Sequence, residues 1–132
     1  AWWDGGEPVW ITAERQGVRT ACYFWPGSET ELHGRRPSRW LPFDPSQTCA
    51  QRVDGLLAWL DDPALSGTRL FTAYFDLVDT AGHRHGPDAP ETAAAVREAD
   101  AAVGRLIDGL RRRGLLETTD LIVVSDHGMA RT

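Results

Sequence analysis

The chain has 132 residues, of which 42% are hydrophobic and 25% charged, and its formal net charge is -5. This size and composition predict one soluble domain or a piece of one. The acidic balance argues against a nucleic-acid polymer as a partner, because proteins that bind one carry a basic patch or stripe. A small phosphate substrate is not excluded, since metal ions can supply positive charge locally. No apolar run approaches the ~20 residues of a membrane span.

The N-terminal half predicts two helices separated by a strand and a long loop. Residues 8–16 are expected to form a short helix and residues 18–25, which are β-branched and aromatic, a strand. Residues 26–45 contain four prolines and are expected to form a surface loop of functional length. Residues 44–47 have the pattern of a capping box, which predicts a helix that runs from there to about Leu60.

The C-terminal half predicts two buried strands joined by a helix. Residues 69–78 and 121–124 are nearly continuous apolar runs, as in strands covered on both faces. Between them, apolar residues recur at spacings of three and four, and Gly114 suits the end of that helix. The alternation of helices and strands predicts an α/β fold, with a mostly parallel sheet flanked by helices.

Two Asp/His pairs follow the two predicted C-terminal strands. Asp79 and His83 follow the first, and Asp126 and His127 follow the second. If both strands lie in one sheet, the crossover makes them parallel, and their carboxyl ends meet at one edge. Asp and His are ligand types that zinc accepts, and Gly82 would permit a tight turn that aims the first pair at one ion. Either pair alone is better explained as turn residues or helix caps, whereas two matched pairs favour a metal site.

Four segments of the chain resemble motifs of one known family. Residues 79–87 resemble the D-x-x-G-H-x-x-G-P motif of nucleotide pyrophosphatase/phosphodiesterases, since they read Asp-Thr-Ala-Gly-His-Arg-His-Gly-Pro. Residues 125–129 resemble the S-D-H-G-M motif of the same family, since they read Ser-Asp-His-Gly-Met. Residues 24–28 resemble the F-W-P-G-S segment of that family, and residues 8–14 resemble the stretch before it. The family belongs to the alkaline phosphatase superfamily. The resemblance covers nearly the whole chain, and it implies that residues 1–132 are a single segment from the middle of such a catalytic domain.

The resemblance implies a partial alkaline-phosphatase-like fold and a two-zinc hydrolase of nucleotide phosphodiester or pyrophosphate bonds. Matched residue by residue, Asp79 and His83 would bind one Zn²⁺, and Asp126 and His127 the other. The family's nucleophile is a Thr that forms a covalent nucleotidyl intermediate. No Thr of this chain stands in that context, so we expect the segment alone to be inactive. Family habit implies an extracellular or periplasmic location.

Three alternatives remain beside this interpretation. The first is a phosphodiesterase of the same family that cleaves lysophospholipids or choline phosphodiesters. The second is a metal-dependent mutase of the same superfamily, against which the F-W-P-G-S and D-x-x-G-H-x-x-G-P segments argue. The third is a non-enzymatic α/β module in which the Asp/His pairs are only turn residues.

Three further features carry expectations of their own. The resemblance places a substrate-stacking aromatic ring after residues 24–28, where Phe43 is preferred to Trp40, although both rings could simply pin the loop to the body. Sheet edges that lack a partner strand predict self-association of the segment. Cys22 and Cys49 are the only cysteines, and the sequence leaves open whether they form a disulfide or stay buried thiols.

Overall fold

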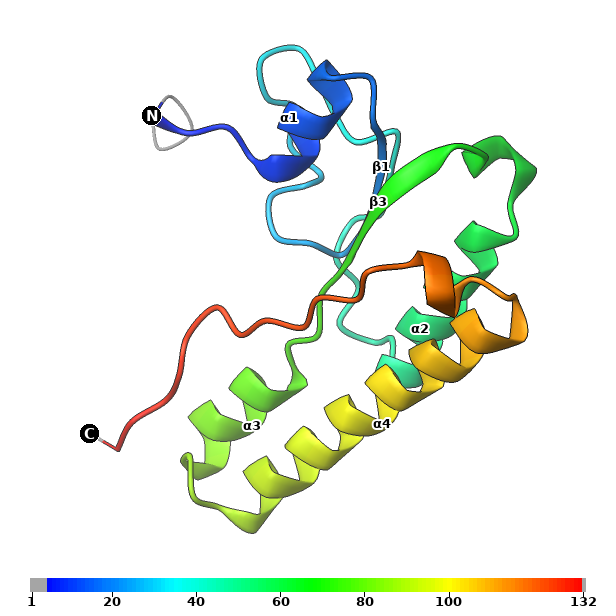
Figure 1. The fold of residues 1–132 in the computed structure, drawn as a ribbon. Helices are drawn as coiled ribbons and strands as arrows, with labels where there is room; N and C mark the ends of the chain where they lie inside the picture. Colours follow the sequence, from blue (N-terminus) through cyan, green and yellow to red (C-terminus); the bar gives the residue numbers. More distant parts are fainter. Residues whose placement is uncertain (1–4, 132) are drawn as a thin grey trace. The chain divides into compact units, whose positions relative to one another are not determined.

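The computed structural model describes residues 5–131 and divides the chain into two compact units. The first unit comprises the described part of Ala1–Thr48 together with Ala58–Tyr74, and the second comprises Cys49–Leu57 and the described part of Phe75–Thr132. Figure 1 shows the elements of both along the chain. None of the helices described between residues 5 and 131 combines the length and the apolar composition that crossing a bilayer requires.

The first unit is built on a three-stranded parallel sheet. Its elements are α1 (Val9–Arg15), β1 (Arg19–Tyr23), β2 (Arg39–Trp40), the 3-10 helix η2 (Pro63–Leu65) and β3 (Thr68–Ala73). The strand order is β2-β1-β3, and the central β1 runs parallel to both neighbours, so that Ala21 lies opposite both Arg39 and Phe71. The predicted parallel sheet is therefore confirmed, as are the helix over 8–16 and the strand within 18–25.

The core of the first unit lies where α1 packs on β1. Trp10, Ile11, Cys22 and Leu32 form a buried cluster, against which Trp40 of β2 is also packed. The last four residues of β1 are all buried, as expected for a central strand of β-branched and aromatic character. The two-residue strand β2 lies within the segment predicted to be a loop, because a strand this short leaves no periodic signal.

Glu14 of α1 ties this helix to the sheet. Its Oε1 accepts hydrogen bonds from Thr20 N at 2.8 Å, Thr20 Oγ1 at 2.9 Å and Ser38 N at 2.8 Å. Burial alone would raise the pKa of this carboxyl, but the hydrogen bonds from Ser38 and Thr20 outweigh it and hold the pKa below its ordinary value of 4.5. Glu14 is therefore ionised at neutral pH and joins three parts of the chain.

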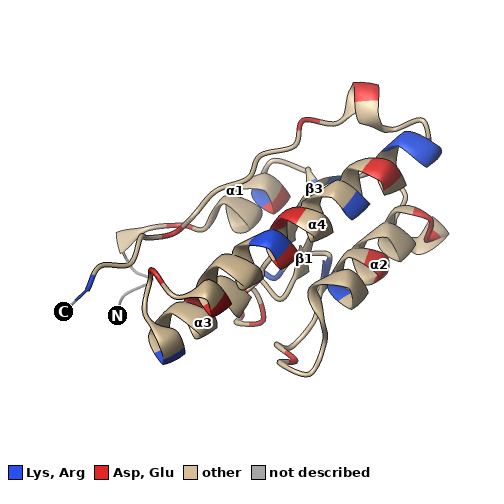
Figure 2. Ribbon diagram, turned by 90° about the horizontal axis from the view of Figure 1, so that it is seen from below, with Lys and Arg blue, Asp and Glu red and all other residues tan. Residues whose placement is uncertain are grey.

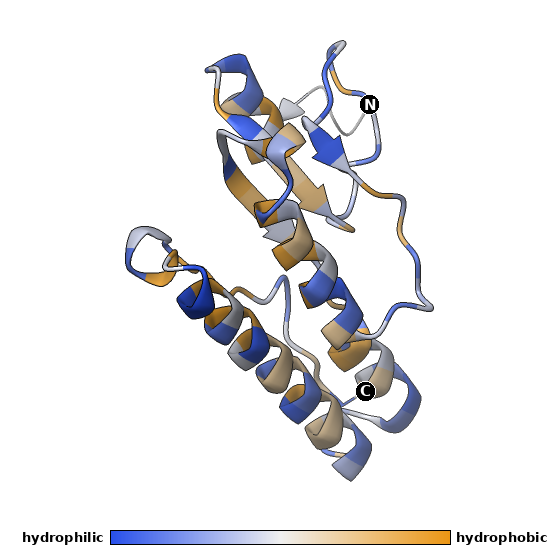
Figure 3. Cartoon of the chain, turned by 90° about the vertical axis from the view of Figure 1, so that its right-hand side faces the viewer, coloured by the Kyte–Doolittle hydropathy of each residue, from blue (hydrophilic) through white to orange (hydrophobic). Residues whose placement is uncertain are grey.

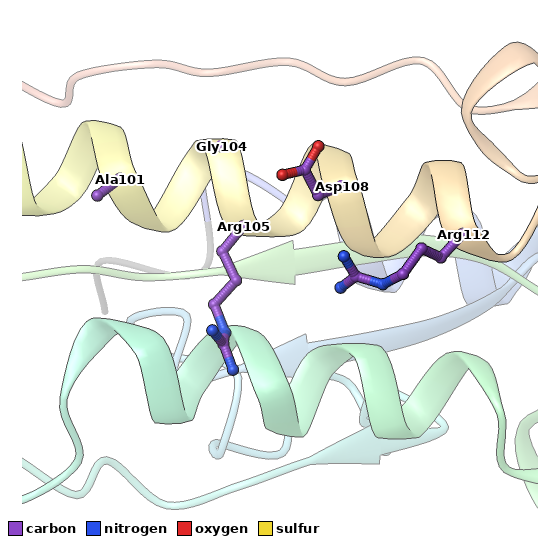
Figure 4. A pocket seen from close by; sticks show the side chains of 5 residues that line it. All are labelled: Ala101, Gly104, Arg105, Asp108 and Arg112. Atoms are coloured by element: carbon purple, nitrogen blue, oxygen red, sulfur yellow. The ribbon is translucent and has the colours of Figure 1, made fainter.

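The second unit consists of helices followed by an extended segment. Its elements are the part of α2 (Cys49–Leu60) up to Leu57, then α3 (Leu77–His85), α4 (Pro90–Arg112) and the 3-10 helix η3 (Leu116–Thr118). Helices α3 and α4 lie side by side. Arg105 of α4 reaches toward α2, as Figure 4 shows, and its guanidinium pairs with both carboxylate oxygens of Asp54 at 2.7 and 2.8 Å.

Helix α4 ends where its sequence predicts, before Gly114. Pro90 stands in its first turn with Glu91, and the basic Arg111 and Arg112 stand in its last turn, where cations complement the helix dipole. Gly114 follows with a φ of 66°, a left-handed conformation that suits glycine. Acidic and basic residues are interspersed along the helix (Figure 2), and so are hydrophilic and hydrophobic ones (Figure 3). The predicted helix that ends before Gly114 is confirmed.

The predicted strand over 69–78 is wrong in its second half. Strand β3 ends at Ala73, and Asp76 already has the backbone of a helix start, with φ of -94° and ψ of -5°. A short apolar run does not distinguish a buried strand from a buried helix, and here the run spans both. Residues 79–83, predicted to follow a strand, therefore lie inside α3.

The predicted strand over 121–124 is not formed in the described part of the chain. Ile122, Val123 and Val124 are 80, 68 and 68% exposed, and no ladder partner is described for them. A strand needs a neighbour to take up its backbone hydrogen bonds, so the apolar run alone does not make one. The β-α-β crossover predicted for residues 69–125 is accordingly absent here.

The start of α2 also differs from the prediction. The helix begins at Cys49 rather than directly after residues 44–47. The carboxylate of Asp44 instead accepts hydrogen bonds from the backbone N–H of Ser46 at 2.9 Å and from its hydroxyl at 2.6 Å. Asp44 thus closes a local turn, which is a common alternative to helix capping for this residue type.

Candidate metal centre

Helix α3 brings the first Asp/His pair together. Asp79 and His83 stand one helical turn apart, and Asp79 Oδ1 lies 3.3 Å from His83 Nε2. Residues at this spacing face each other on a helix. The convergence predicted from a tight turn at Gly82 is therefore produced by helical periodicity, and Gly82 itself is a buried residue of the helix.

The extended segment after η3 brings the second pair to the same place. His127 Nε2 lies 3.7 Å from Asp79 Oδ1 and 3.7 Å from Asp126 Oδ2. Asp79 therefore stands between two imidazoles that are distant in sequence. The four residues were predicted to meet at the edge of a sheet. Here Asp79 and His83 lie on α3, and His127 reaches Asp79 from the extended segment, with no second strand involved.

The ring of His127 is oriented by its own neighbours. Its Nδ1 lies 3.0 Å from the carbonyl oxygen of Gly128, and its backbone N–H donates to Asp126 Oδ1 at 3.1 Å. In the tautomer whose Nδ1–H donates to this carbonyl, Nε2 keeps its lone pair on the side of Asp79. The Gly128 carbonyl first, and then the carboxylates of Asp126 and Asp79, raise the pKa of His127 above its ordinary value, although desolvation lowers it.

One oxygen of this cluster lacks a hydrogen-bond donor. Asp79 Oδ1 is buried, and no described residue hydrogen-bonds to it. Buried polar atoms are nearly always paired, because leaving one unpaired costs its lost hydration. The two atoms nearest to Oδ1 in these contacts are imidazole nitrogens, which can themselves bind a cation. An oxygen in this position is what a metal site needs.

The donor types and one spacing fit zinc. Ligand atoms about 2.0–2.1 Å from a tetrahedral Zn²⁺ lie roughly 3.4 Å from one another, close to the 3.3 Å between Asp79 and His83. The 3.7 Å between Asp79 and His127 is somewhat longer. Among residues 5–131, no three His, Cys, Asp or Glu side chains are already arranged as a metal-binding group. The cluster thus supplies suitable pairs of donors, but not a preformed set of three.

The two predicted aromatic residues both belong to the first unit. The Phe43 ring is 45% exposed, and its centroid lies 5.6 Å from that of Phe24 and 6.2 Å from that of Tyr74. Trp40 is half-buried against the core cluster, with the Arg36 guanidinium 5.2 Å from its ring centroid. Trp40 therefore fastens the loop to the core, whereas Phe43 keeps an accessible ring surface.

A largely buried ion pair stands at the start of α3. Arg52 Nη1 of α2 lies 2.8 Å from Asp76 Oδ1, and the two side chains are 4 and 29% exposed. The Asp76 carbonyl also accepts the Thr80 N–H at 2.9 Å inside α3. The pair fixes the first turn of the helix that carries Asp79. Its only signal in the sequence is an Asp within an otherwise apolar run.

A surface hollow on α4 and the two cysteines are not part of the candidate metal centre. A hollow of about 400 Å³ lies on α4, and none of its lining residues belongs to the Asp/His cluster. Figure 4 shows these residues, Ala101, Gly104, Arg105, Asp108 and Arg112. Cys22 and Cys49 are free, buried thiols, and burial raises the pKa of Cys22 to about 11.

Comparisons with known proteins agree with the motifs. Residues 1–132 match the family model described as type I phosphodiesterase / nucleotide pyrophosphatase. The chain is 44% identical to an uncharacterised pyrophosphatase/phosphodiesterase of Schizosaccharomyces pombe, over 99% of the chain and 27% of that protein. It is 43% identical to a venom phosphodiesterase of Crotalus durissus collilineatus, over 98% of the chain and 15% of that protein. It is 39% identical to ectonucleotide pyrophosphatase/phosphodiesterase family member 3 of Mus musculus, over 100% of the chain and 15% of that protein.

A solved structure is similar as well. Murine ectonucleotide pyrophosphatase/phosphodiesterase 5, as an inactive variant in complex with AMP, superposes with a TM-score of 0.74 at 30% identity. The match covers 83% of this chain and 29% of that one. The chain therefore spans less than a third of the length of each of these relatives, and the α/β fold class is confirmed.

Proposed function

The chain belongs to the type I phosphodiesterase / nucleotide pyrophosphatase family, in the alkaline phosphatase superfamily, and on this basis we propose that it is the middle part of the catalytic domain of a two-zinc hydrolase. The full-length protein would cleave phosphodiester or pyrophosphate bonds of nucleotides. Asp79 and His83 would hold one Zn²⁺, and Asp126 and His127 the other. The observation that carries this proposal is the buried, donorless Asp79 Oδ1 between two imidazole nitrogens.

The chemistry of such a site suits the residues present. Zinc held by these residues would supply positive charge that stabilises the charge developing on a phosphoryl group. Asp79 supplies a carboxylate to this site, and the Gly128 carbonyl holds the His127 ring with Nε2 toward Asp79. The remaining ligands and the Thr nucleophile would come from outside this segment, so we expect the 132-residue chain to bind metal without hydrolysing substrate.

A nucleotide is the favoured substrate. A structural neighbour at 30% identity is in complex with AMP, and the exposed ring of Phe43 offers a surface on which a base could stack. Relatives of this chain are named as ectonucleotide enzymes and as venom phosphodiesterases. This supports a location outside the cytoplasm, either extracellular or periplasmic.

The segment by itself should also associate with copies of itself. Neither β2 nor β3 has a second partner strand among the described residues, and residues 122–124 expose an apolar run. Such unpaired edges recruit other chains. Light scattering across a concentration series should show the mass of the 132-residue chain rising with concentration. A clean monomer at high concentration would reject this part of the proposal.

The test of function is one substitution at the metal centre with a matched control. Asp126→Asn in the full-length protein should lower both the zinc content and the hydrolysis of a nucleotide ester by at least about 10-fold. Asp120→Asn changes an exposed Asp earlier in the same segment and should leave both unchanged. Unchanged zinc and activity in Asp126→Asn would instead favour a module whose Asp/His pairs are turn residues. Faster cleavage of a choline ester than of the nucleotide ester would contradict the assigned substrate.

A further inference from the structure

The second Asp/His pair lies on a segment with little structure of its own. Residues 119–131 form neither a helix nor a strand, and most of them are exposed. His127 nevertheless lies within 3.7 Å of Asp79 on α3. Something other than secondary structure must therefore hold this segment against the helix.

Gly82 of α3 and Met129 of the segment pack against each other. A Cβ atom built on Gly82 would lie 2.4 Å from Met129 Sδ and 2.8 Å from Met129 Cε, so the thioether occupies the space that any larger residue at 82 would need. Glycine inside a helix is normally less favourable than alanine. Its presence in α3 therefore has a structural reason, which is the docking of Met129.

The position of this contact matters for the ligands. Gly82 is adjacent to His83 and stands three residues after Asp79, which places it on the same side of the helix as Asp79. Met129 is two residues after His127, and two residues of chain span at most about 7 Å. Fixing the thioether at Gly82 therefore restricts where the imidazole of His127 can lie.

A second contact holds the end of the segment. Arg131 pairs with Asp88, which lies between α3 and α4. Both side chains are largely exposed, at 77 and 63%, and exposed ion pairs of this kind contribute little to stability. The docking of Met129 therefore restrains the segment in a way that this ion pair does not.

We infer that Gly82 and Met129 interlock to set the distance between the two ligand pairs, Asp79/His83 and Asp126/His127. Both are positioning residues, since neither offers zinc a ligand of the type that these pairs supply. The inference rests on the proposed metal centre. It adds that the glycine and the methionine of the two motifs belong to one packing unit.

The first experiment needs no metal. Met129 is the only methionine of the chain, so ¹³C-methyl methionine labelling gives one NMR signal. That methyl group should show a nuclear Overhauser effect to the Gly82 Hα protons. Gly82→Ala should remove this contact and shift the methyl signal. Gly104→Ala is the matched control, because it makes the same change inside α4 where a Cβ meets nothing within 4 Å, and it should leave the signal unchanged.

The second experiment measures the affinity of the full-length protein for Zn²⁺ in competition with a chromophoric chelator. Gly82→Ala should weaken binding by about 10-fold or more, as loss of support for a ligand does, while Gly104→Ala keeps the wild-type affinity. The melting temperature of Gly82→Ala should not fall, because the atoms that its Cβ would meet are the far end of the flexible Met129 side chain on an exposed segment, which can move away, and alanine favours the helix. A purely structural role of Gly82 predicts no change in zinc affinity.

Met129→Ala keeps the glycine and tests the same contact from the other side. It should weaken zinc binding to a similar degree, and the double variant should lose little more than either single one, because both changes break one contact. Wild-type zinc affinity in Gly82→Ala and Met129→Ala would overturn the interlock alone. A full-length wild-type protein that binds no zinc would overturn the metal centre together with the interlock.

Discussion

The buried ion pair between Arg52 and Asp76 gives a sharp prediction about the stability of the second unit. Arg52→Met keeps most of the apolar stem but removes the guanidinium, which leaves the Asp76 carboxylate without its partner at 2.8 Å. Breaking a buried pair on one side costs about 3–5 kcal/mol of unfolding free energy. Because the Asp76 side chain retains 29% exposure, we expect the lower end, about 3 kcal/mol.

The same unit offers a matched control. Arg105 also pairs with a carboxylate, that of Asp54, but these two side chains are 49 and 51% exposed. Arg105→Met should hardly change the urea midpoint, because solvent and salt screen an exposed pair. The two variants thus remove the same kind of group from ion pairs of similar length and differ in burial.

Urea unfolding followed by circular dichroism at 222 nm suits this test, because α4 alone supplies 23 helical residues. Asp76 makes no side-chain cap hydrogen bond, so the cost of Asp76→Ala comes mainly from the ion pair. The double variant Arg52→Met/Asp76→Ala should therefore lose less than the sum of the two single ones. A loss below about 1 kcal/mol in Arg52→Met, or one equal to that of Arg105→Met, would refute the role given to burial.

Three further predictions concern packing, pH and reactivity. Gly109→Ala should lower the melting temperature, because its Cβ would lie 2.4 Å from Leu57 Cδ1. Such overpacking costs about 1–3 kcal/mol, which exceeds the roughly 1 kcal/mol of helix stability gained from alanine. Gly104→Ala meets open space and should raise the melting temperature. The carboxyl of Glu14 has a pKa below 4.5 in the folded chain, so its contribution to stability is complete above pH 4.5 and is lost as the pH falls through the lowered pKa. Glu14→Gln should therefore be less stable than the wild type at pH 7. A difference in urea midpoint between the two proteins that is as large at pH 2 as at pH 7 would contradict this. Cys22 is fully buried, and its pKa is raised to about 11. It should therefore resist alkylation by iodoacetamide at pH 8 until urea unfolds the chain. Rapid labelling of Cys22 in the native protein would count against this.

Local sequence signals predicted the elements whose causes are local. Helix α4 combines a long periodic pattern with a proline at its start and a glycine past its end, and each of these acts through nearby residues. Strand β1 was predicted from its β-branched and aromatic composition alone. Such elements need no knowledge of distant partners.

The two errors at apolar runs have a common physical origin. Residues 69–78 and 121–124 are both apolar, and composition cannot tell whether such a run pairs as a strand, turns into a helix or stays unpaired. The first run pairs with β1 only as far as Ala73 and then enters α3. The second has no described partner. Pairing is decided by residues far away in the sequence.

The candidate site also combines residues that local motifs predicted with contacts that depend on distant residues. Asp79, His83, Asp126 and His127 were selected from their motifs, and the contacts join Asp79 to both imidazoles and Asp126 to His127. The predicted β-α-β crossover, which would bring the ends of two strands together, does not form among the described residues. The Arg52–Asp76 pair and the docking of Met129 on Gly82 join residues that are more than twenty positions apart, and no local pattern names the partner in either case. The role of the four residues as zinc ligands stays a prediction.

Anomalous X-ray diffraction at the zinc edge, on crystals of the full-length protein, tests the metal centre most directly. We expect two peaks, one about 2.0–2.2 Å from side-chain atoms of Asp79 and His83, and the other at the same distance from Asp126 and His127. Difference maps with no zinc peak near Asp79 Oδ1, in crystals that retain hydrolytic activity when dissolved, would contradict the account.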